Sequence, residues 1–220
     1  MPVFTNDALN VRICHDSLRG NRDVNADALT VAECGSRLAI AVADGAGDND
    51  GAAECARIAA LLASAITAAT GNPLRGLDET APFLTERADA AAIPLTARTT
   101  ATILAITPDH LTLAWAGDSP AWAITRDGQV RGLTDPSCHP CLTPCNVTEP
   151  HEGATYSPHW ASLDRGEVAR LILASDGLTA HLARPARADH VQAMTDTLAP
   201  NRIPSPPPRR RPGRPARPDP

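Results

Sequence analysis

Three short aliphatic runs in this 220-residue sequence each lead to an aspartate that has a glycine neighbour. The aspartates are Asp44, Asp118 and Asp176. An apolar run of roughly four to eight residues that stops at turn-forming residues is typical of a buried β-strand. Glycine permits a sharp turn at that point and leaves the backbone open to a ligand. The pattern therefore predicts strands that each deliver one carboxylate to the edge of a sheet.

Further apolar runs predict that these strands pair in an antiparallel manner. Several runs lie only a few residues apart and are separated by turn formers, for example Cys34, Gly35 and Ser36, which is the spacing of a β-hairpin. The middle of the chain is therefore expected to be an antiparallel meander. The expected strands are residues 29–33, 38–43, 100–107, 111–116, 121–126, 129–133 and 171–174.

Two helices are also predicted. Residues 52–69 place apolar side chains at the helical period, are rich in helix formers and stop at Gly71, Asn72 and Pro73. Residues 80–92 are a second candidate. Since aromatic residues make up only 3% of the chain, small aliphatic side chains must build the core, and stacking on nucleic-acid bases is not expected.

The three strand-end aspartates have two possible meanings. One Asp-Gly pair alone is most simply a turn. Three carboxylates at one place raise one another's pKa unless a cation neutralises them. A convergent cluster would therefore be a site of oxygen ligands suited to Mg²⁺ or Mn²⁺.

Six segments in order resemble the successive motifs of the metal-dependent serine/threonine protein phosphatases of type 2C, over residues 20–182. The resemblance implies an α+β fold, a four-layer α-β-β-α sandwich in which two antiparallel sheets pack face to face and helices cover them. The segments are GNRDVNADAL, AVADGAG, TARTTATILAI, LAWAGDSPAWAI, GLTDPS and LILASDGL.

The resemblance also implies a set of metal ligands for two Mn²⁺ or Mg²⁺ ions. Asp44 matches the aspartate that bridges the two metals, and the backbone carbonyl of Gly45 matches a ligand of the second metal. Asp176 matches a ligand of the first metal. Asp118 matches an aspartate that helps to hold a weaker third metal in some members.

Two further positions match residues around the metals, and three depart from the family pattern. Arg22 matches the arginine that grips the substrate phosphate, and Asp27 matches an aspartate near the metal-bound waters. Ala26 stands where an acidic residue is usual, and Ala46 offers no general acid where histidine or methionine is common. Pro120 replaces an arginine and lacks a backbone donor.

The end of the family pattern has no match in this chain. The family closes with an Asp-Asn pair and a last strand that supply one more metal ligand, and nothing after Leu182 resembles them. Residues 188–198 correspond to the helix that precedes this strand. We therefore expect a phosphatase-like domain over residues 1–199 that lacks its final strand.

Residues 200–220 form a tail of different composition. They contain six arginines, one aspartate and repeated prolines, a charge of +5, which leaves −10 for residues 1–199. Such a segment is expected to be disordered or partly polyproline II. Apart from non-specific contacts of this basic tail, no binding of nucleic acid is expected.

A second constellation contains Cys138, Cys141 and Cys145, with His139 among them. Three thiolates and one imidazole can bind Zn²⁺ in a tetrahedral site. The compact spacing is interrupted by proline, and no second CxxC pair is present. A loop of reduced thiols is therefore the simpler interpretation.

Two functions follow from these patterns. The first is a phosphatase that removes phosphate from serine or threonine of proteins through a metal-activated water, in signalling that opposes a bacterial-type Ser/Thr kinase. The alternative is a catalytically impaired module that binds phosphorylated partners or acts as a scaffold.

No secretory signal or membrane span is evident, since the longest apolar stretch, residues 58–69, is too short to cross a bilayer. A cytoplasmic location is expected.

Overall fold

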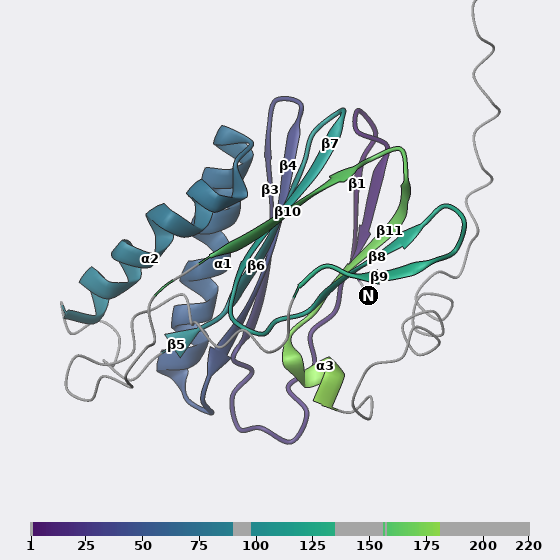
Figure 1. Cartoon of the computed structure of the whole chain (residues 1–220). Coiled ribbons are helices and arrows are strands. Elements are labelled where there is room, and N and C mark those ends of the chain that lie inside the picture. The colour runs from purple at the N-terminus through teal and green to yellow at the C-terminus, as the bar shows by residue number, and fades with distance from the viewer. Residues whose placement is uncertain (1, 90–97, 135–155, 157, 181–220) are drawn as a thin grey trace, which may run out of the picture.

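The computed structural model describes residues 2–89, 98–134, 156 and 158–180 (Figure 1). The largest element is an antiparallel sheet in the order β10-β7-β6-β4-β3, with β5 paired to the end of β4. Because β4, β6 and β7 lie in its middle, almost all of their residues are buried. The strands are β3 (Asp27–Cys34), β4 (Arg37–Ala46), β5 (Arg98–Thr99), β6 (Ala101–Ile106), β7 (His110–Ala116) and β10 (His159–Asp164).

A second group of strands packs against this sheet. It consists of an antiparallel three-stranded sheet in the order β11-β8-β9 and a hairpin of β1 and β2. Leucine, isoleucine and valine side chains from both groups share one apolar cluster, which includes Leu38 and Leu113 from the large sheet and Ile13 from the hairpin. The strands are β1 (Val3–Asn6), β2 (Val11–Cys14), β8 (Ala121–Thr125), β9 (Val130–Gly132) and β11 (Val168–Leu173).

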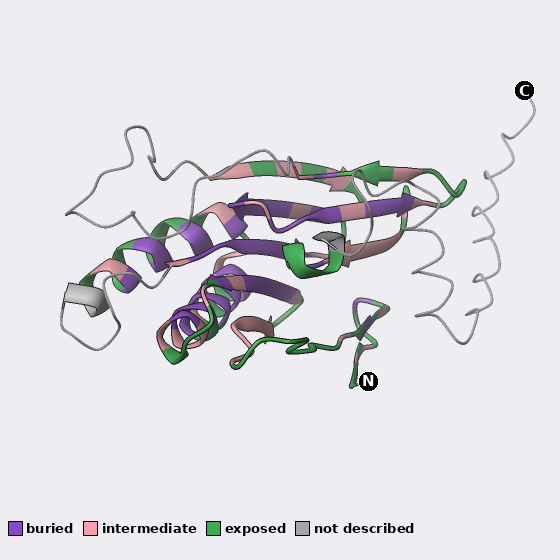
Figure 2. Ribbon diagram, turned by 90° about the horizontal axis from the view of Figure 1, so that it is seen from below, coloured by how far each residue is buried: buried purple, intermediate pink, exposed green. Residues whose placement is uncertain are grey.

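Two antiparallel helices cover the other face of the large sheet. Helix α1 (Asp50–Thr70) begins at the N-cap Asn49, whose side chain accepts the N–H of Ala52, and ends at Gly71 in the left-handed conformation. Its alanines pack on β4 and β3, and α2 (Pro73–Asp89) packs on β7. Figure 2 shows that buried residues lie in the central strands and on the helices. The α+β class, with antiparallel sheets and with helices on the large sheet, is thereby confirmed.

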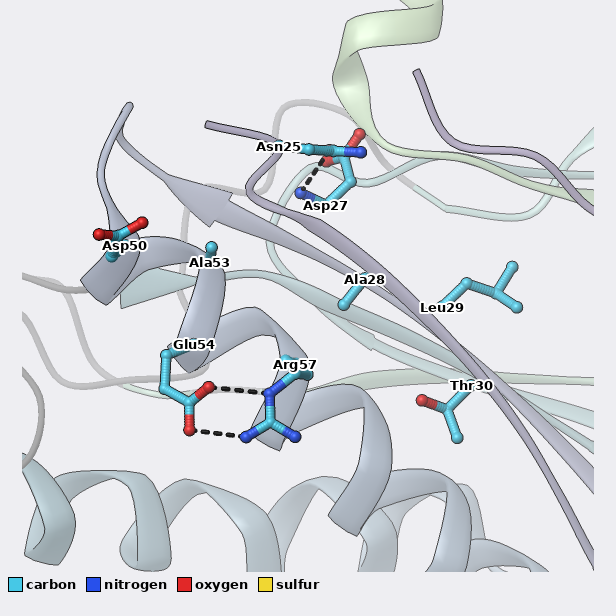
Figure 3. Close-up of a pocket in the computed structure, with 9 residues that line it drawn as sticks. All are labelled: Asn25, Asp27, Ala28, Leu29, Thr30, Asp50, Ala53, Glu54 and Arg57. Atoms are coloured by element: carbon cyan, nitrogen blue, oxygen red, sulfur yellow. Dashed lines mark hydrogen bonds and ion pairs between the residues drawn. The ribbon is translucent and has the colours of Figure 1, made fainter. Parts of the chain in front are cut away.

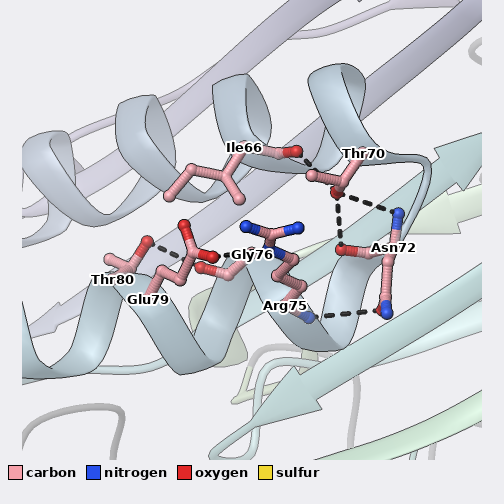
Figure 4. Close-up of polar contacts among 7 residues, drawn as sticks. All are labelled: Ile66, Thr70, Asn72, Arg75, Gly76, Glu79 and Thr80. Carbon is pink, nitrogen blue, oxygen red and sulfur yellow. Dashed lines mark hydrogen bonds and ion pairs between the residues drawn. The ribbon is translucent and has the colours of Figure 1, made fainter.

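Helix α2 begins earlier than the sequence suggested. We expected it over residues 80–92, but it starts at Pro73. Proline is favoured in the first turn of a helix, and the side chain of Asn72 accepts the N–H of Arg75 at 3.2 Å, so the residues that stop α1 also cap α2 (Figure 4). The start of α2 was placed too late because Gly71, Asn72 and Pro73 are signals both for the end of one helix and for the start of the next.

Other differences concern edge elements. Strands β1, β2 and β10 were not predicted. Of the three cysteines among the described residues, Cys14 and Cys34 are exposed at strand ends and Cys55 is buried, although small apolar thiols are common in protein cores. The expected helix 188–198, the tail 200–220 and any final strand lie outside the described residues.

Helix α1 is long and apolar enough to cross a membrane by length and composition. Of the apolar stretch of α1 that meets this criterion, 56% is buried inside the protein, where the alanines of the helix contact the sheet. The core helix of a globular domain meets the same criterion, and this packing accounts for the apolar composition of α1.

Candidate metal and phosphate site

Asp27 and Asp44 lie opposite each other on neighbouring strands. Strands β3 and β4 pair in an antiparallel register that places Asp27 against Asp44. Side chains of directly opposed residues project from the same face of a sheet, with their Cβ atoms about 5 Å apart. The register of this hairpin therefore brings together two carboxylates that are 17 residues apart in sequence.

The third carboxylate comes from the second sheet. Asp176 begins the short helix α3 (Asp176–Ala180), directly after β11, and its carboxyl group is hydrogen-bonded to that of Asp44. The hydroxyl of Ser175 donates to Oδ2 of Asp27 at 2.8 Å. The Ser175-Asp176 pair thus contacts both aspartates of the first sheet and joins the two sheets at one end of the strands.

These contacts change the acidity of the cluster. Burial, the hydrogen bond with Asp176 and the negative charges of Asp27 and Asp176 raise the pKa of Asp44 from 3.8 to about 7. Burial and the charge of Asp176 also raise the pKa of Asp27, although the Ser175 hydroxyl and Arg22 act in the opposite direction. The cluster therefore favours a proton or a cation over three free negative charges.

The donor chemistry of the cluster fits a hard divalent cation. Carboxylate oxygens are the ligands that Mg²⁺ and Mn²⁺ prefer, and a cation relieves the repulsion that raises the pKa values here. Within the described ranges, no group of three or more His, Cys, Asp or Glu side chains stands in metal-ligand geometry. Asp44 and Asp176 instead share a hydrogen bond. The chemistry and charge of the cluster therefore fit a divalent cation, and a hydrogen bond between Asp44 and Asp176 stands in place of coordination.

The backbone around Asp44 is held tightly. The carbonyl of Asp44 accepts hydrogen bonds from the N–H of Thr100 at 2.9 Å and from the hydroxyl of Thr99 at 3.0 Å. The N–H of Gly45 donates to the carbonyl of Ala26 at 3.0 Å. A Cβ atom at position 45 would lie 2.4 Å from the carbonyl oxygen of Ala52 in α1, so only glycine fits between β4 and the helix.

Asp118 lies in the turn that follows β7, half-buried. Its neighbour Ser119 is buried and shares a 2.6 Å hydrogen bond with the hydroxyl of Thr100. The Ser119 carbonyl also accepts the Thr102 hydroxyl at 2.9 Å. Through Thr100, this turn is fixed to the backbone of Asp44, and it places Asp118 at the same end of the strands as the three carboxylates.

Arg22 lies on an exposed loop between β2 and β3, and its charge reaches the cluster. The guanidinium group lowers the pKa of Asp27, opposing the effect of burial. Asp48 holds this loop in place, because its carboxylate accepts the N–H groups of Asp23 at 3.1 Å and Val24 at 2.8 Å. One positive side chain is thus held beside three carboxylates.

Several residues of this site were missed from the sequence. Ser175, Thr99, Thr100 and Asp48 make the contacts described above, yet only Ser175 carried a local signal, as the residue before Asp176. The other three bond to backbone groups at least 24 residues away. The zinc candidates Cys138, His139, Cys141 and Cys145 lie outside the described residues.

An open groove adjoins the cluster. It has a volume of about 600 Å³ and lies between β3 and the first two turns of α1 (Figure 3). Asp27 lines its inner end, so the groove and the carboxylate cluster share one residue. Asp50, Glu54 and Arg57 line it from α1.

Comparison with known proteins gives one family and one fold. The family model for protein phosphatase 2C matches residues 16–206. No match was found among curated protein sequences.

Three solved structures illustrate the shared fold. Serine/threonine phosphatase Stp1 from Staphylococcus aureus has a TM-score of 0.61 and 18% identity, over 83% of this chain and 86% of that chain. PppA, a key regulatory component of T6SS in Pseudomonas aeruginosa, has a TM-score of 0.59 and 19% identity, over 85% and 83%. A bacterial serine phosphatase has a TM-score of 0.59 and 17% identity, over 81% and 87%. At these identities the likeness shows the fold alone.

Proposed function

Because the chain belongs to the protein phosphatase 2C family, we propose that it hydrolyses phosphoserine and phosphothreonine on proteins with the help of bound Mn²⁺ or Mg²⁺. The observation that supports this most directly is the convergence of Asp27, Asp44 and Asp176 beside Arg22. Neither strand pairing nor core packing requires three carboxylates at one place, where the pKa values of Asp27 and Asp44 are raised. Retention of this arrangement is understandable if a cation binds there.

The proposed roles are those that the family resemblance implies for these positions. Asp44 and Asp176 would hold two divalent ions together with the carbonyl of Gly45, and Asp118 would contribute to a weaker third site. Bound ions of this kind supply a hydroxide at neutral pH and positive charge for the phosphoryl oxygens. Asp27 would accept hydrogen bonds from water at the site, where Ser175 fixes its orientation.

Arg22 would bind and orient the phosphate group. A guanidinium group donates two parallel hydrogen bonds to phosphate oxygens, which fixes the phosphorus in position for in-line attack. Ala46 cannot donate a proton, so a water molecule would protonate the leaving serine or threonine oxygen.

A second candidate function is a phosphatase-like module that binds phosphorylated proteins without hydrolysis. Ala26 favours it, because an acidic contact usual in the family is missing there. In that case Arg22 and the carboxylates would bind phosphate and metal but turn over slowly.

Hydrolysis assays distinguish the two functions. The purified chain would be tested on p-nitrophenyl phosphate and on a phosphothreonine peptide with Mn²⁺, with Mg²⁺ and with excess EDTA. We expect turnover that requires metal and that falls by more than about 100-fold in Asp44→Asn, since even outer-shell partners of metal ligands commonly contribute 10–100-fold. Asp109→Asn, which changes an exposed loop carboxylate, is the matched control.

The outcomes are separable. Turnover that persists in EDTA or in Asp44→Asn would refute the proposed site. A folded wild-type protein that hydrolyses neither substrate, but still binds the phosphothreonine peptide, would establish the second function instead.

The wider setting is part of the same proposal. A cytoplasmic phosphatase of this kind would act on proteins phosphorylated by a bacterial-type Ser/Thr kinase. Residues 1–199 would form the catalytic domain, and the arginine- and proline-rich residues 200–220 an appended tail.

A further inference from the structure

The groove between β3 and α1, called here the β3–α1 groove, has a shape suited to an extended chain. Its strand wall runs from Asp27 to Thr30 and its helix wall from Asp50 to Arg57. Three steps along a strand and seven along a helix both span about 10 Å. The two walls are therefore matched in length, and the groove can hold about three extended residues.

One wall of this groove is the edge of the large sheet. In the part of the chain that the structure describes, β3 pairs only with β4. The outer edge of such a strand presents backbone N–H and C=O groups that an added peptide strand can bind. Ala28, Leu29 and Thr30 line the groove along this strand; Ala28 and Thr30 are small, and Leu29, between them, alternates to the other side of β3 (Figure 3).

Charge in the groove varies along its length. Glu54 and Arg57 form an ion pair at its far end, with both carboxylate oxygens of Glu54 bonded at 2.7 and 2.8 Å. Asp50 lies one helical turn before Glu54, in the first turn of α1, and forms no ion pair with any described residue. On the helix wall of the groove, Asp50 is therefore the carboxylate that can pair with a basic side chain of a bound peptide.

The inner end of the groove is continuous with the candidate catalytic site. Asp27 belongs to both, and Arg22, the proposed phosphate ligand, lies on the loop that leads to Asn25 and β3. A phosphoresidue bound at Arg22 would leave its neighbours in sequence at the mouth of the groove.

We propose that the β3–α1 groove binds the segment of a phosphoprotein substrate that flanks the phosphoresidue, and that Asp50 selects a basic side chain within about three residues of it. This inference rests on the proposed phosphatase function and adds the class of sequence on which the site acts. An acidic flanking segment would meet Asp50 without a compensating cation and would be disfavoured.

Paired peptides test this selection. Two phosphothreonine peptides would differ only in having lysine or glutamate at the second and third positions on both sides of the phosphothreonine. We expect the wild-type protein to show a kcat/KM about tenfold higher for the lysine peptide, the effect of one favourable charge contact in a partly exposed groove. In Asp50→Lys this ratio should fall to about one or below.

A control separates local from overall charge. Glu79→Lys changes the net charge by the same amount on α2, where Glu79 pairs with Arg75 and does not line the groove. This variant should keep the wild-type ratio. Asp50→Asn, a milder change with circular dichroism as a check of folding, should give an intermediate ratio.

Each result bears on a defined claim. Three results would refute peptide binding in the β3–α1 groove, provided that p-nitrophenyl phosphate is still hydrolysed. They are an equal kcat/KM for the two peptides in the wild type, an unchanged ratio of the two values in Asp50→Lys, and an equal decrease of this ratio in Glu79→Lys. Absence of metal-dependent p-nitrophenyl phosphate hydrolysis in the wild type would instead overturn the proposed function, and the groove assignment with it.

Discussion

At the scale of single residues, Asp44 shows how burial and neighbouring charge create a binding site. Its carboxyl group is partly buried, hydrogen-bonded to Asp176 and near Asp27, and each of these raises its pKa. In the unfolded chain the same group is ionised above its ordinary pKa of 3.8. The folded protein therefore binds a proton at Asp44 more tightly than the unfolded chain does.

This difference predicts how stability depends on pH in the absence of metal. Because the pKa of Asp44 is higher in the folded state, its contribution to the free energy of unfolding is fully present below pH 3.8 and is lost as the pH rises through about 7. In EDTA, the thermal midpoint should fall between pH 5 and pH 8. The fall should be smaller in Asp44→Asn, and an equal fall in both proteins would contradict the assigned pKa.

A second residue-scale prediction concerns Asp48, which positions the loop that carries Arg22. Asp48→Ala removes the acceptor for the N–H groups of Asp23 and Val24. We expect kcat/KM for a phosphothreonine peptide to fall about tenfold, as for other residues that orient a ligand-binding group. Most of the loss should appear in KM, because phosphate binding by Arg22 is disturbed while the carboxylates remain in place.

Partial rescue distinguishes positioning from a general loss of structure. Asp48→Asn retains one side-chain oxygen acceptor and should recover part of the activity. If Asn and Ala at this position behave alike, or if KM is unchanged, Asp48 does not act through the Arg22 loop.

At the scale of elements, the crossing of α1 and α2 depends on one small residue. A Cβ atom at Gly76 would lie 2.2 Å from the hydroxyl oxygen of Thr67 and 2.8 Å from the carbonyl oxygen of Ala63. The Gly76 carbonyl also accepts the Thr80 hydroxyl at 2.7 Å (Figure 4). Close approach of the two helices therefore requires glycine at this position.

Gly76→Ala should accordingly destabilise the protein. Overpacking of this kind typically costs about 1–3 kcal/mol, which denaturant unfolding would measure as a lower midpoint at unchanged slope. Gly132→Ala in β9 is the matched control, since its Cβ atom would meet nothing within 4 Å. A loss of the same size in both variants would mean that the helix crossing is not the cause.

The elements predicted from sequence were those with strong local patterns. Helix α1 and the strands β3, β4, β6 and β7 have runs of apolar residues bounded by turn formers, and the structure places them where these runs predicted. Strand β10 was missed, because its alternating pattern in HWASLD is short and half-exposed. Its pairing with β7 depends on contacts with residues more than 40 positions away.

The site was predictable in part for the same reason. Sequence located Asp44, Asp118 and Asp176 at strand ends, since glycine and apolar runs mark these ends locally, whereas Asp27 was named only through the family resemblance. Which strand ends share an edge depends on sheet register and on packing between the sheets, and these contacts join distant segments. Supporting residues such as Thr99 and Thr100 therefore became evident only in the fold.

At the scale of the whole molecule, the site exists only where two sheets meet. Asp27 and Asp44 belong to the large sheet, whereas Asp176 follows β11 of the other. Opposite the site, Arg165 ties the two groups of strands together by donating to the carbonyls of Leu9 and Thr107. Core packing thus holds three like charges together against their mutual repulsion.

A ligand that neutralises this repulsion should stabilise the entire domain. Mn²⁺ that binds the folded site but not the unfolded chain raises the free energy of unfolding by about 2.7 kcal/mol at a concentration 100-fold above its Kd, or about 5–10 °C in thermal midpoint for a chain of this size. The shift should disappear in Asp44→Asn and persist in Asp109→Asn. Because this readout requires no turnover, it tests metal binding even if the alanine at position 26 abolishes catalysis. An equal shift in Asp44→Asn would place the metal elsewhere in the molecule.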